Sequence, residues 1–134
     1  MTEPSRISVR KAMRTDVSFI DGRKNVLEAL RAMRDGKVTS LIVEKRSDTD
    51  EYGILTLSDI AKKVIAIDRA PERVHVFEIM SKPVICVSPE MDIRYCARLF
   101  ERFGMRRAPV MENDKVIGMI SYYHLVLEAL PELD

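Results

Sequence analysis

The polar residues best placed to do chemistry close a short apolar run, Gly53-Ile54-Leu-Thr56-Leu-Ser58-Asp59. We expect a strand to end here and a helix to begin, and a helix N-terminus exposes backbone N–H groups that suit a phosphate. The hydroxyls of Thr56 and Ser58 can donate to phosphate oxygens, and the Asp59 carboxylate can accept both hydroxyls of a ribose. The same spacing is typical of a helix cap that binds nothing. Both interpretations stay open at this point.

A related segment, Gly118-Met119-Ile-Ser121-Tyr-Tyr-His124, follows 65 residues later. It keeps a hydroxyl at Ser121 but has His124 where the first segment has Asp59. A neutral imidazole cannot accept two ribose hydroxyls as a carboxylate can, and a helix N-terminus opposes its protonation. A ligand role for His124 is one interpretation, and a surface or capping role is the alternative.

Basic side chains accompany the second segment, and Lys82 precedes the second copy's first expected strand. Arg102, Arg106 and Arg107 lie beside an expected hairpin. The planar guanidinium suits phosphate, although a solvated charged face is the other interpretation.

No catalytic set is visible in the sequence. There is no Cys–His or Ser–His pair at a recognisable spacing, no H-E-x-x-H and no P-loop. Cys86 falls in an expected strand and Cys96 on an apolar helix face, so we predict that both are core residues. The two histidines, His75 and His124, are far apart and give no zinc signature. We predict a non-enzymatic protein without a metal.

The chain contains two copies of one unit, offset by 67 residues and then by 65 after a shorter hairpin loop. Each copy predicts the order β-α-β-β-α, an α/β fold in which the two copies pack with pseudo-twofold symmetry. Concave seams between such halves are usual ligand sites. We expect glycine C-caps at Gly36 and Gly104. The copies are placed at residues 8–67 and 76–130, with a linker at 68–75. The expected strands lie near 17–21, 39–45, 51–56, 84–88, 107–112 and 115–121. Apolar spacing predicts one amphipathic helix through Val26, Leu30 and Met33 and another through Ile93, Cys96, Ala97, Phe100 and Phe103, and closing helices are expected over about 58–67 and 122–130.

Composition limits the class of protein. The 134 residues are 46% hydrophobic and 32% charged, with 22 basic and 21 acidic residues, which is typical of a folded soluble domain. The net charge of +1 predicts neither a nucleic-acid partner nor a membrane surface. No secretion signal or membrane span is apparent, so we expect a reduced, cytoplasmic protein.

The repeated unit resembles the CBS domain, and nearly the whole chain looks like a stand-alone tandem pair of them. The resemblance rests on the order and duplication of several short motifs. These are Val9-Arg-Lys-Ala-Met13 and Val76-Phe-Glu-Ile-Met80, Asn25-Val-Leu-Glu-Ala-Leu30, Gly104-Met-Arg-Arg-Ala-Pro-Val-Met111, and the two glycine-led segments above.

The resemblance implies a regulatory module that binds AMP, ADP, ATP or S-adenosylmethionine between the halves and requires no cofactor for catalysis. The family motif implies that Thr56 contacts phosphate and Asp59 the ribose, in a site completed by Ile54, Ser58, Lys82, Pro83, Met105, Arg106 and Arg107. A weaker mirror site would use Thr15, Asp16, Val38, Thr39, Met119, Ser121 and His124.

Three interpretations from two classes of protein follow. An adenine-nucleotide sensor is favoured by the Thr56–Asp59 pair. A ligand-free module for dimerisation or protein interaction is the alternative, and an S-adenosylmethionine-type ligand is a third. The resemblance also implies a homodimer formed through helices and a protein partner in trans.

Overall fold

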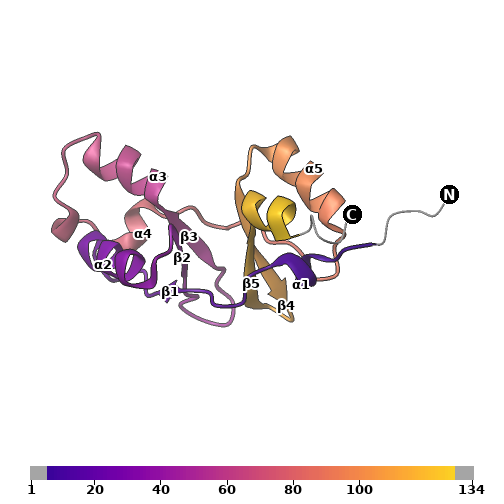
Figure 1. Ribbon diagram of the computed structural model, residues 1–134. Helices are drawn as coiled ribbons and strands as arrows, with labels where there is room; N and C mark the ends of the chain where they lie inside the picture. The colour runs from indigo at the N-terminus through magenta and orange to yellow at the C-terminus, as the bar shows by residue number, and fades with distance from the viewer. Residues whose placement is uncertain (1–5, 129–134) are drawn as a thin grey trace. The chain divides into compact units, whose positions relative to one another are not determined.

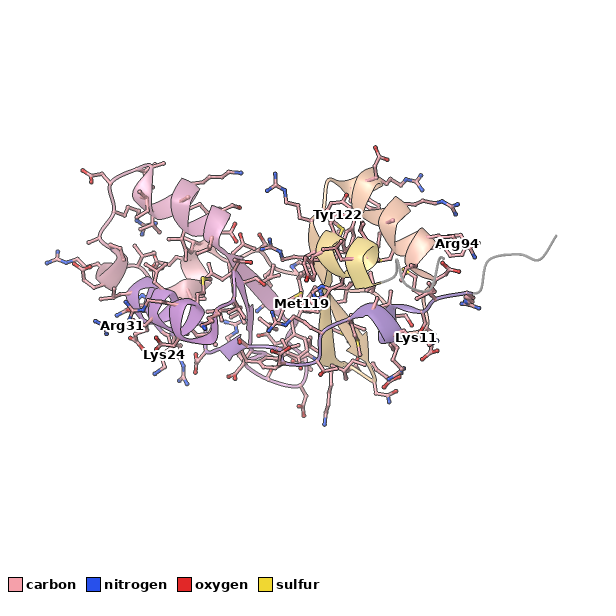
Figure 2. All side chains as sticks on the ribbon, viewed as in Figure 1. Lys11, Lys24, Arg31, Arg94, Met119 and Tyr122 are labelled. Carbon is pink, nitrogen blue, oxygen red and sulfur yellow. The ribbon has the colours of Figure 1, made fainter. Side chains whose placement is uncertain are left out.

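The computed structural model describes residues 6–128, which form two compact units (Figure 1). The continuous unit is Ser18–Val84. The split unit combines Met1–Val17 with Ile85–Asp134, and its described parts are residues 6–17 and 85–128. Charged side chains point outward from both units, as Lys24 and Arg31 of the first and Lys11 of the second show (Figure 2).

The continuous unit is built on a three-stranded sheet. Its strands are β1 (Phe19–Ile20), β2 (Ser40–Val43) and β3 (Gly53–Thr56), in the order β1-β2-β3. β1 is parallel to β2, and β2 forms the predicted antiparallel hairpin with β3. The residues of β2 and β3 are mostly buried, as expected for short apolar runs covered by helices.

Helix α2 (Val26–Gly36) follows β1. It begins at Asn25, whose side chain accepts a hydrogen bond from the Glu28 N–H at 2.8 Å. Its end differs from the prediction, because the left-handed C-cap is Lys37, with φ of 53°, and Gly36 is still helical. The glycine therefore lies one residue before the position that needs positive φ.

The remaining helices of the continuous unit are short. Helix α3 (Leu57–Ile60) runs into the π-helical turn η1 (Ala61–Ile65), in place of the predicted helix over 58–67. The predicted linker contains the 3₁₀ turn η2 (Pro71–Arg73), and α4 (Val76–Ile79) comes next.

The split unit contains α1 (Val9–Ala12), α5 (Ile93–Phe103), and the strands β4 (Arg107–Glu112) and β5 (Lys115–Ser121). The predicted hairpin is present, and its turn places Asn113 and Asp114 at φ of 53° and 62°. Positive φ at both central residues is the pattern of a tight hairpin turn. Gly104 is the left-handed cap of α5 as predicted, with φ of 64°. The last helix includes η3 (His124–Glu128), and the predicted end at Leu130 falls outside the described residues.

The strand predicted at 84–88 is wrong, since Val87 makes only one parallel bridge, to Val110. Its N–H donates to the Pro109 carbonyl, and its carbonyl accepts from the Met111 N–H. Extending this ladder in either direction would need an N–H from Pro109 or from Pro89. Proline has none, so the ladder stops after one bridge.

The leading segment of each copy packs with the opposite copy. Val74, Val76 and Ile79 belong to the core of the continuous unit, together with residues of β2, β3 and α2. Ile7, Val9 and Ala12 belong to the core of the split unit, beside Cys96 and Phe100 of α5 and Ile120 of β5. Each compact unit therefore contains the leading segment of the other sequence repeat. We call these two leading segments the exchanged segments.

Two glycines allow this exchange. The exchanged residue Ser81 pairs with Ile54 through two 2.9 Å backbone hydrogen bonds, and Arg14 pairs with Met119 through two of 3.0 Å. A methyl group added at Gly53 would lie 2.8 Å from the Met80 Sδ and 3.1 Å from the Ser81 carbonyl oxygen. One added at Gly118 would lie 2.5 Å from the Met13 Sδ and 2.8 Å from the Arg14 carbonyl oxygen. Only glycine lets the backbones approach this closely.

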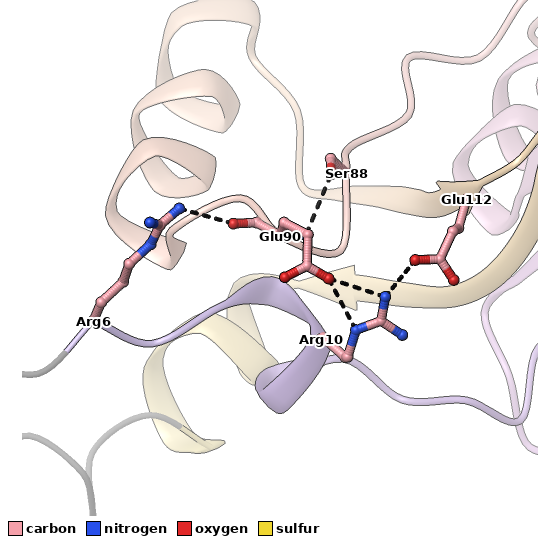
Figure 3. Close-up of polar contacts among 5 residues, drawn as sticks. All are labelled: Arg6, Arg10, Ser88, Glu90 and Glu112. Carbon is pink, nitrogen blue, oxygen red and sulfur yellow. Dashed lines mark hydrogen bonds and ion pairs between the residues drawn. The ribbon is translucent and has the colours of Figure 1, made fainter.

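Ion pairs also join the exchanged helix α1 to the split unit (Figure 3). Arg10 Nη2 lies 3.0 Å from Glu90 Oε1 and also pairs with Glu112, and Arg6 donates to the Glu90 carbonyl at 3.0 Å. The side chains of Arg10 and Glu90 are 45% and 70% exposed, so these pairs add little stability. The apolar core and the backbone pairing hold the segment.

We expect Gly118→Ala to destabilise the split unit by about 1–3 kcal/mol, the usual cost of overpacking, because the Arg14 carbonyl cannot move without breaking its pairing. Urea unfolding followed by circular dichroism measures the change. Gly36→Ala is the control, since its added methyl would meet nothing closer than 3.6 Å, and it should leave the transition unchanged or slightly raised. Equal transitions for all three proteins would contradict this account.

Candidate ligand-binding site

The first half-site lies where β3 runs into α3. The side chains of Thr56 and Asp59 form a complete capping box. The Asp59 N–H donates to Thr56 Oγ1 at 3.2 Å, and the Thr56 N–H donates to Asp59 Oδ2 at 2.9 Å. The Thr56 hydroxyl also lies 3.0 Å from Asp59 Oδ2 and 3.3 Å from the hydroxyl of exposed Ser58. The capping interpretation of this motif is therefore confirmed.

The capping role leaves part of the Asp59 carboxylate for other partners. Its Oδ2 takes both contacts from Thr56, whereas Oδ1 lies 3.5 Å from Lys63 Nζ. Lys63 in turn donates to the Ile79 carbonyl at 2.9 Å. A carboxylate accepts about four hydrogen bonds, so the capping contacts do not exhaust its capacity. The Asp59 side chain is 14% exposed, which keeps it reachable from solvent.

The exchanged segment brings Lys82 and Pro83 alongside β3. Ser81 pairs with Ile54, and the Val84 N–H donates to the Tyr52 carbonyl at 3.4 Å. Lys82 and Pro83 therefore lie near the start of β3, at the opposite end of the strand from Thr56. Of the predicted first site, this unit holds Ile54, Thr56, Ser58, Asp59, Lys82 and Pro83.

Lys82 is held by a carboxylate that the sequence analysis missed. Its Nζ lies 2.6 Å from Asp50 Oδ1, in the loop between β2 and β3. Asp50 Oδ2 also accepts from the Arg46 N–H at 2.9 Å and from Arg46 Nε at 3.1 Å. The Lys82 ammonium, followed by these Arg46 contacts, holds the pKa of the Asp50 carboxyl well below its usual range. No sequence signal joins a loop aspartate to a lysine 32 residues later, whereas the i,i+4 spacing of Asp59 and Lys63 could have been recognised.

The second half-site repeats this arrangement in the split unit. The Ser121 N–H donates to His124 Nδ1 at 3.1 Å, and the Ser121 hydroxyl lies 2.9 Å from the same nitrogen. His124 thus takes the position of a capping carboxylate. The exposed residues Thr15 and Asp16 follow Arg14, which pairs with Met119 of β5.

Asp16 is paired with Arg14. Its two carboxylate oxygens accept from Arg14 Nε at 2.8 Å and from Nη2 at 2.5 Å. The Arg14 guanidinium lowers the pKa of Asp16 to about 2, with a small further contribution from His124 when its ring is protonated. Asp16 is therefore a carboxylate at every pH near neutrality.

Neither unit alone contains a full predicted site. Met105, Arg106 and Arg107, predicted for the first site, lie in the split unit at the end of α5 and the start of β4. Val38 and Thr39, predicted for the second site, lie in the continuous unit just before β2. In each unit, one exchanged segment pairs with the strand that ends at the hydroxyl of the helix cap.

The other candidate residues give no catalytic centre. Cys96 is buried as predicted, and burial raises the pKa of its thiol to about 11. Cys86 is only partly buried, because the strand expected there is a single bridge, so its prediction as a core residue is wrong. Across residues 6–128, no three His, Cys, Asp or Glu side chains gather as metal ligands would. In the same part of the chain, no helix has both the length and the apolar character to span a bilayer.

Comparison with known proteins identifies the repeated unit. The family model for the CBS domain matches residues 9–66 and 76–130. A hexameric CBS-CP12 protein from bloom-forming cyanobacteria, known from its crystal structure, superposes with a TM-score of 0.89 at 38% identity, over 93% of this chain and 69% of that one.

Two curated relatives show the unit within longer proteins. An "Uncharacterized protein MK0525" from Methanopyrus kandleri is 30% identical over 86% of this chain, which spans 59% of that protein. A homoserine O-acetyltransferase from Methanosalsum zhilinae is 32% identical over 87% of this chain, which spans 23% of the enzyme.

We expect Asp50→Asn to reduce the acid sensitivity of the continuous unit. Because the Asp50 pKa is lowered on folding, its carboxylate stabilises the unit above the unfolded value near pH 4, and this contribution is lost as the pH falls below it. The melting temperature should therefore fall less steeply in the variant as the pH is lowered from 5 to 2. Asp48→Asn, in the same loop, is the control. Identical pH profiles for wild type and Asp50→Asn would contradict the role of the Lys82 pair.

Proposed function

Because the chain belongs to the CBS-domain family and carries two copies of the domain, we propose that it is a non-catalytic regulatory module that binds an adenine nucleotide. The observation that carries the proposal is the placement of two groups along β3 in one unit. Thr56 and Asp59 lie at the end of the strand, and Lys82 and Pro83 lie near its start.

The length of β3 suits a nucleoside phosphate. At about 3.4 Å per residue, the span from Gly53 to Thr56 is roughly 10 Å. In the proposed complex the adenine lies against Pro83 and the stem of Lys82, and the ribose and phosphate reach the far end. Since Asp50 neutralises the Lys82 ammonium, this lysine offers its methylene stem to a flat uncharged base rather than a charge to a phosphate.

Asp59 is the proposed ribose ligand and Thr56 the proposed phosphate ligand. The Asp59 carboxylate holds the Thr56 backbone N–H and hydroxyl through one oxygen, so the cap fixes the rotamer that presents the other. The Thr56 hydroxyl can turn from Asp59 toward a phosphate oxygen while its backbone N–H keeps the cap. Capping and binding are thus two uses of one arrangement, with Ser58 and Ile54 lining it.

The remaining proposed contacts rest on the family resemblance, since Met105, Arg106 and Arg107 belong to the split unit. Met105 would pack on the adenine, and Arg106 and Arg107 would pair with phosphate. These two arginines favour AMP, ADP or ATP over S-adenosylmethionine, which carries no phosphate. The second half-site lacks an acidic residue at position 124, so we propose that it binds more weakly.

We expect AMP, ADP or ATP to raise the melting temperature of the wild type by several degrees, since a ligand at 100 times its Kd adds about 2.7 kcal/mol. Asp59→Asn should abolish this rise, because its amide can still cap Thr56 but cannot accept both ribose hydroxyls. A thermal-shift panel with the three nucleotides, S-adenosylmethionine and buffer measures both effects.

Glu78→Gln is the matched control for this experiment. Glu78 is the capping-box carboxylate of α4 in the same unit, and it accepts from the His75 N–H at 2.7 Å. The control should lose stability to a similar degree yet keep the nucleotide shift. A shift that survives in Asp59→Asn, or that is absent from the wild type for every nucleotide, would contradict the proposal.

A second candidate function, self-association, is favoured by the last helix. Its exposed residues Tyr123, Val126 and Leu127 are 61%, 53% and 51% exposed. The equivalent residues of the first copy, 65 positions earlier, are Ser58, Ala61 and Lys62. An exposed apolar row on one face of a helix favours a contact with another surface. The cyanobacterial relative described as hexameric supports self-association of such units.

We expect Leu127→Lys, which installs the residue of the first copy, to shift the protein toward monomer, since a charge in an apolar contact is strongly unfavourable. Size-exclusion chromatography with light scattering across a range of concentrations measures the mass. Ile67→Lys, at a residue 59% exposed in the other unit, is the control and should leave the mass unchanged. A wild type that is monomeric at every concentration would contradict this function.

A further inference from the structure

The contact between Ser121 and His124 differs from its counterpart in the chemistry of the acceptor. In the first half-site the acceptor is the Asp59 carboxylate, whereas in the second it is a ring nitrogen that can take up a proton. The distances are otherwise alike, at 2.9 Å and 3.1 Å from the backbone nitrogen. The Thr56–Asp59 cap therefore serves as an internal reference for the Ser121–His124 cap.

The backbone hydrogen bond assigns the protonation state of the ring in this arrangement. The Ser121 N–H can only donate, so His124 Nδ1 must be unprotonated and the ring proton lies on Nε2. The Ser121 hydroxyl, 2.9 Å from the same nitrogen, then also donates to it. Its proton is directed at the ring rather than outward.

Protonation of Nδ1 reverses this contact. An imidazolium N–H cannot accept from the Ser121 N–H, so the backbone part of the cap must break. It can instead donate to the Ser121 Oγ, which leaves the hydroxyl proton available to another acceptor. One proton thus opens the cap, turns the hydroxyl outward and adds a positive charge. The Asp59 carboxylate cannot do this near neutral pH, because an aspartate accepts a proton only in acid.

Charges from neighbouring segments act on His124 in both directions. Asp16, in the segment after α1, interacts with the histidine through its negative charge and favours the imidazolium. Opposing cations come from the same segment and from β4, where Arg107 pairs with Ser121 and the Arg106 carbonyl accepts from the Tyr122 N–H. Charged residues on the described segments that contact β5 or the last helix are Asp16 and Arg14 after α1, Arg10 and Lys11 on α1, Arg106 and Arg107 at β4, and Glu101 and Arg102 on α5, whose Phe100 packs against Tyr122.

We propose that His124 is a proton-controlled switch of the second half-site. With the ring neutral, Nδ1 accepts from both the N–H and the hydroxyl of Ser121, and the ring offers a phosphate no positive charge. With the ring protonated, the cap opens and the hydroxyl and the imidazolium both face an anion favourably. The reversal of the hydrogen bond stands on the Ser121 contacts alone, whereas its effect on ligand filling rests on the proposed function.

The test is a pH titration by NMR from pH 8 to 5, without ligand and on the full chain. We expect the Ser121 amide resonance to move with the same midpoint as the ring C–H resonances of His124. The Thr56 amide should stay constant over this range. In His124→Asp, whose carboxylate reproduces the first half-site, the Ser121 amide should also stay constant.

Two results would overturn the switch. One is a Ser121 amide that does not follow the His124 ring, and the other is an amide that still titrates with the same midpoint in His124→Asp. Unfolding of the last helix in His124→Asp would show as collapsed amide dispersion, and His124→Asn, whose side-chain oxygen can accept the same hydrogen bond without titrating, replaces it.

The same spectra with AMP separate the switch from the proposed function. We expect AMP to shift the Thr56 amide at every pH, and the Ser121 amide several-fold more strongly at pH 5.5 than at pH 7.5. No AMP effect on either amide would contradict the proposed function while leaving the proton-dependent cap in place. An AMP effect at Ser121 that is equal at both pH values would overturn the control of ligand filling by His124.

Discussion

The close backbone pairing between each exchanged segment and the last strand of the unit it joins is the constraint on which both half-sites depend. Ser81 pairs with Ile54, and Arg14 pairs with Met119, each through two hydrogen bonds. The pairing fixes where the residues that follow the segment can lie. Lys82 and Pro83, or Thr15 and Asp16, are therefore placed beside the strand by backbone contacts. In the proposed complex, their own side chains need only select the ligand.

The glycines at the start of these pairings explain why the arrangement occurs twice. Gly53 and Gly118 each face the methionine and the carbonyl of an incoming segment at distances that a Cβ would violate. A glycine in a strand interior is otherwise unfavourable, since it adds chain entropy to the unfolded state and packs nothing. Its presence at equivalent positions in both copies is explained by the close approach of a second backbone.

Sequence patterns predicted the local elements of this fold well and its long-range assembly poorly. The hairpins, α2, α5 and the Gly104 cap follow from periodicity and turn chemistry, which act over a few residues. Local patterns could not predict which copy each leading segment packs against, because two similar copies offer each segment two similar docking surfaces. The lost strand at 84–88 was readable in principle. Pro89 and Pro109 remove the two donors that a parallel ladder would need there, but this becomes visible only once the register is known.

The candidate site shows a related division. The polar residues at the start of α3 were identified from their types and spacing, whereas Asp50 was missed because its partner is brought to it by the fold. The sequence also left capping and ligand binding as alternatives for Thr56 and Asp59, and the structure shows that the capping contacts use only one oxygen of the Asp59 carboxylate.

A cap holds a side chain in one rotamer through a backbone N–H, and that is the preorganisation a binding carboxylate requires. Duplication then allows one copy to keep the carboxylate and the other to exchange it for an imidazole without losing the helix. The backbone N–H is satisfied by either acceptor. The chemistry of the half-site can therefore change at one residue while the fold that presents it stays the same.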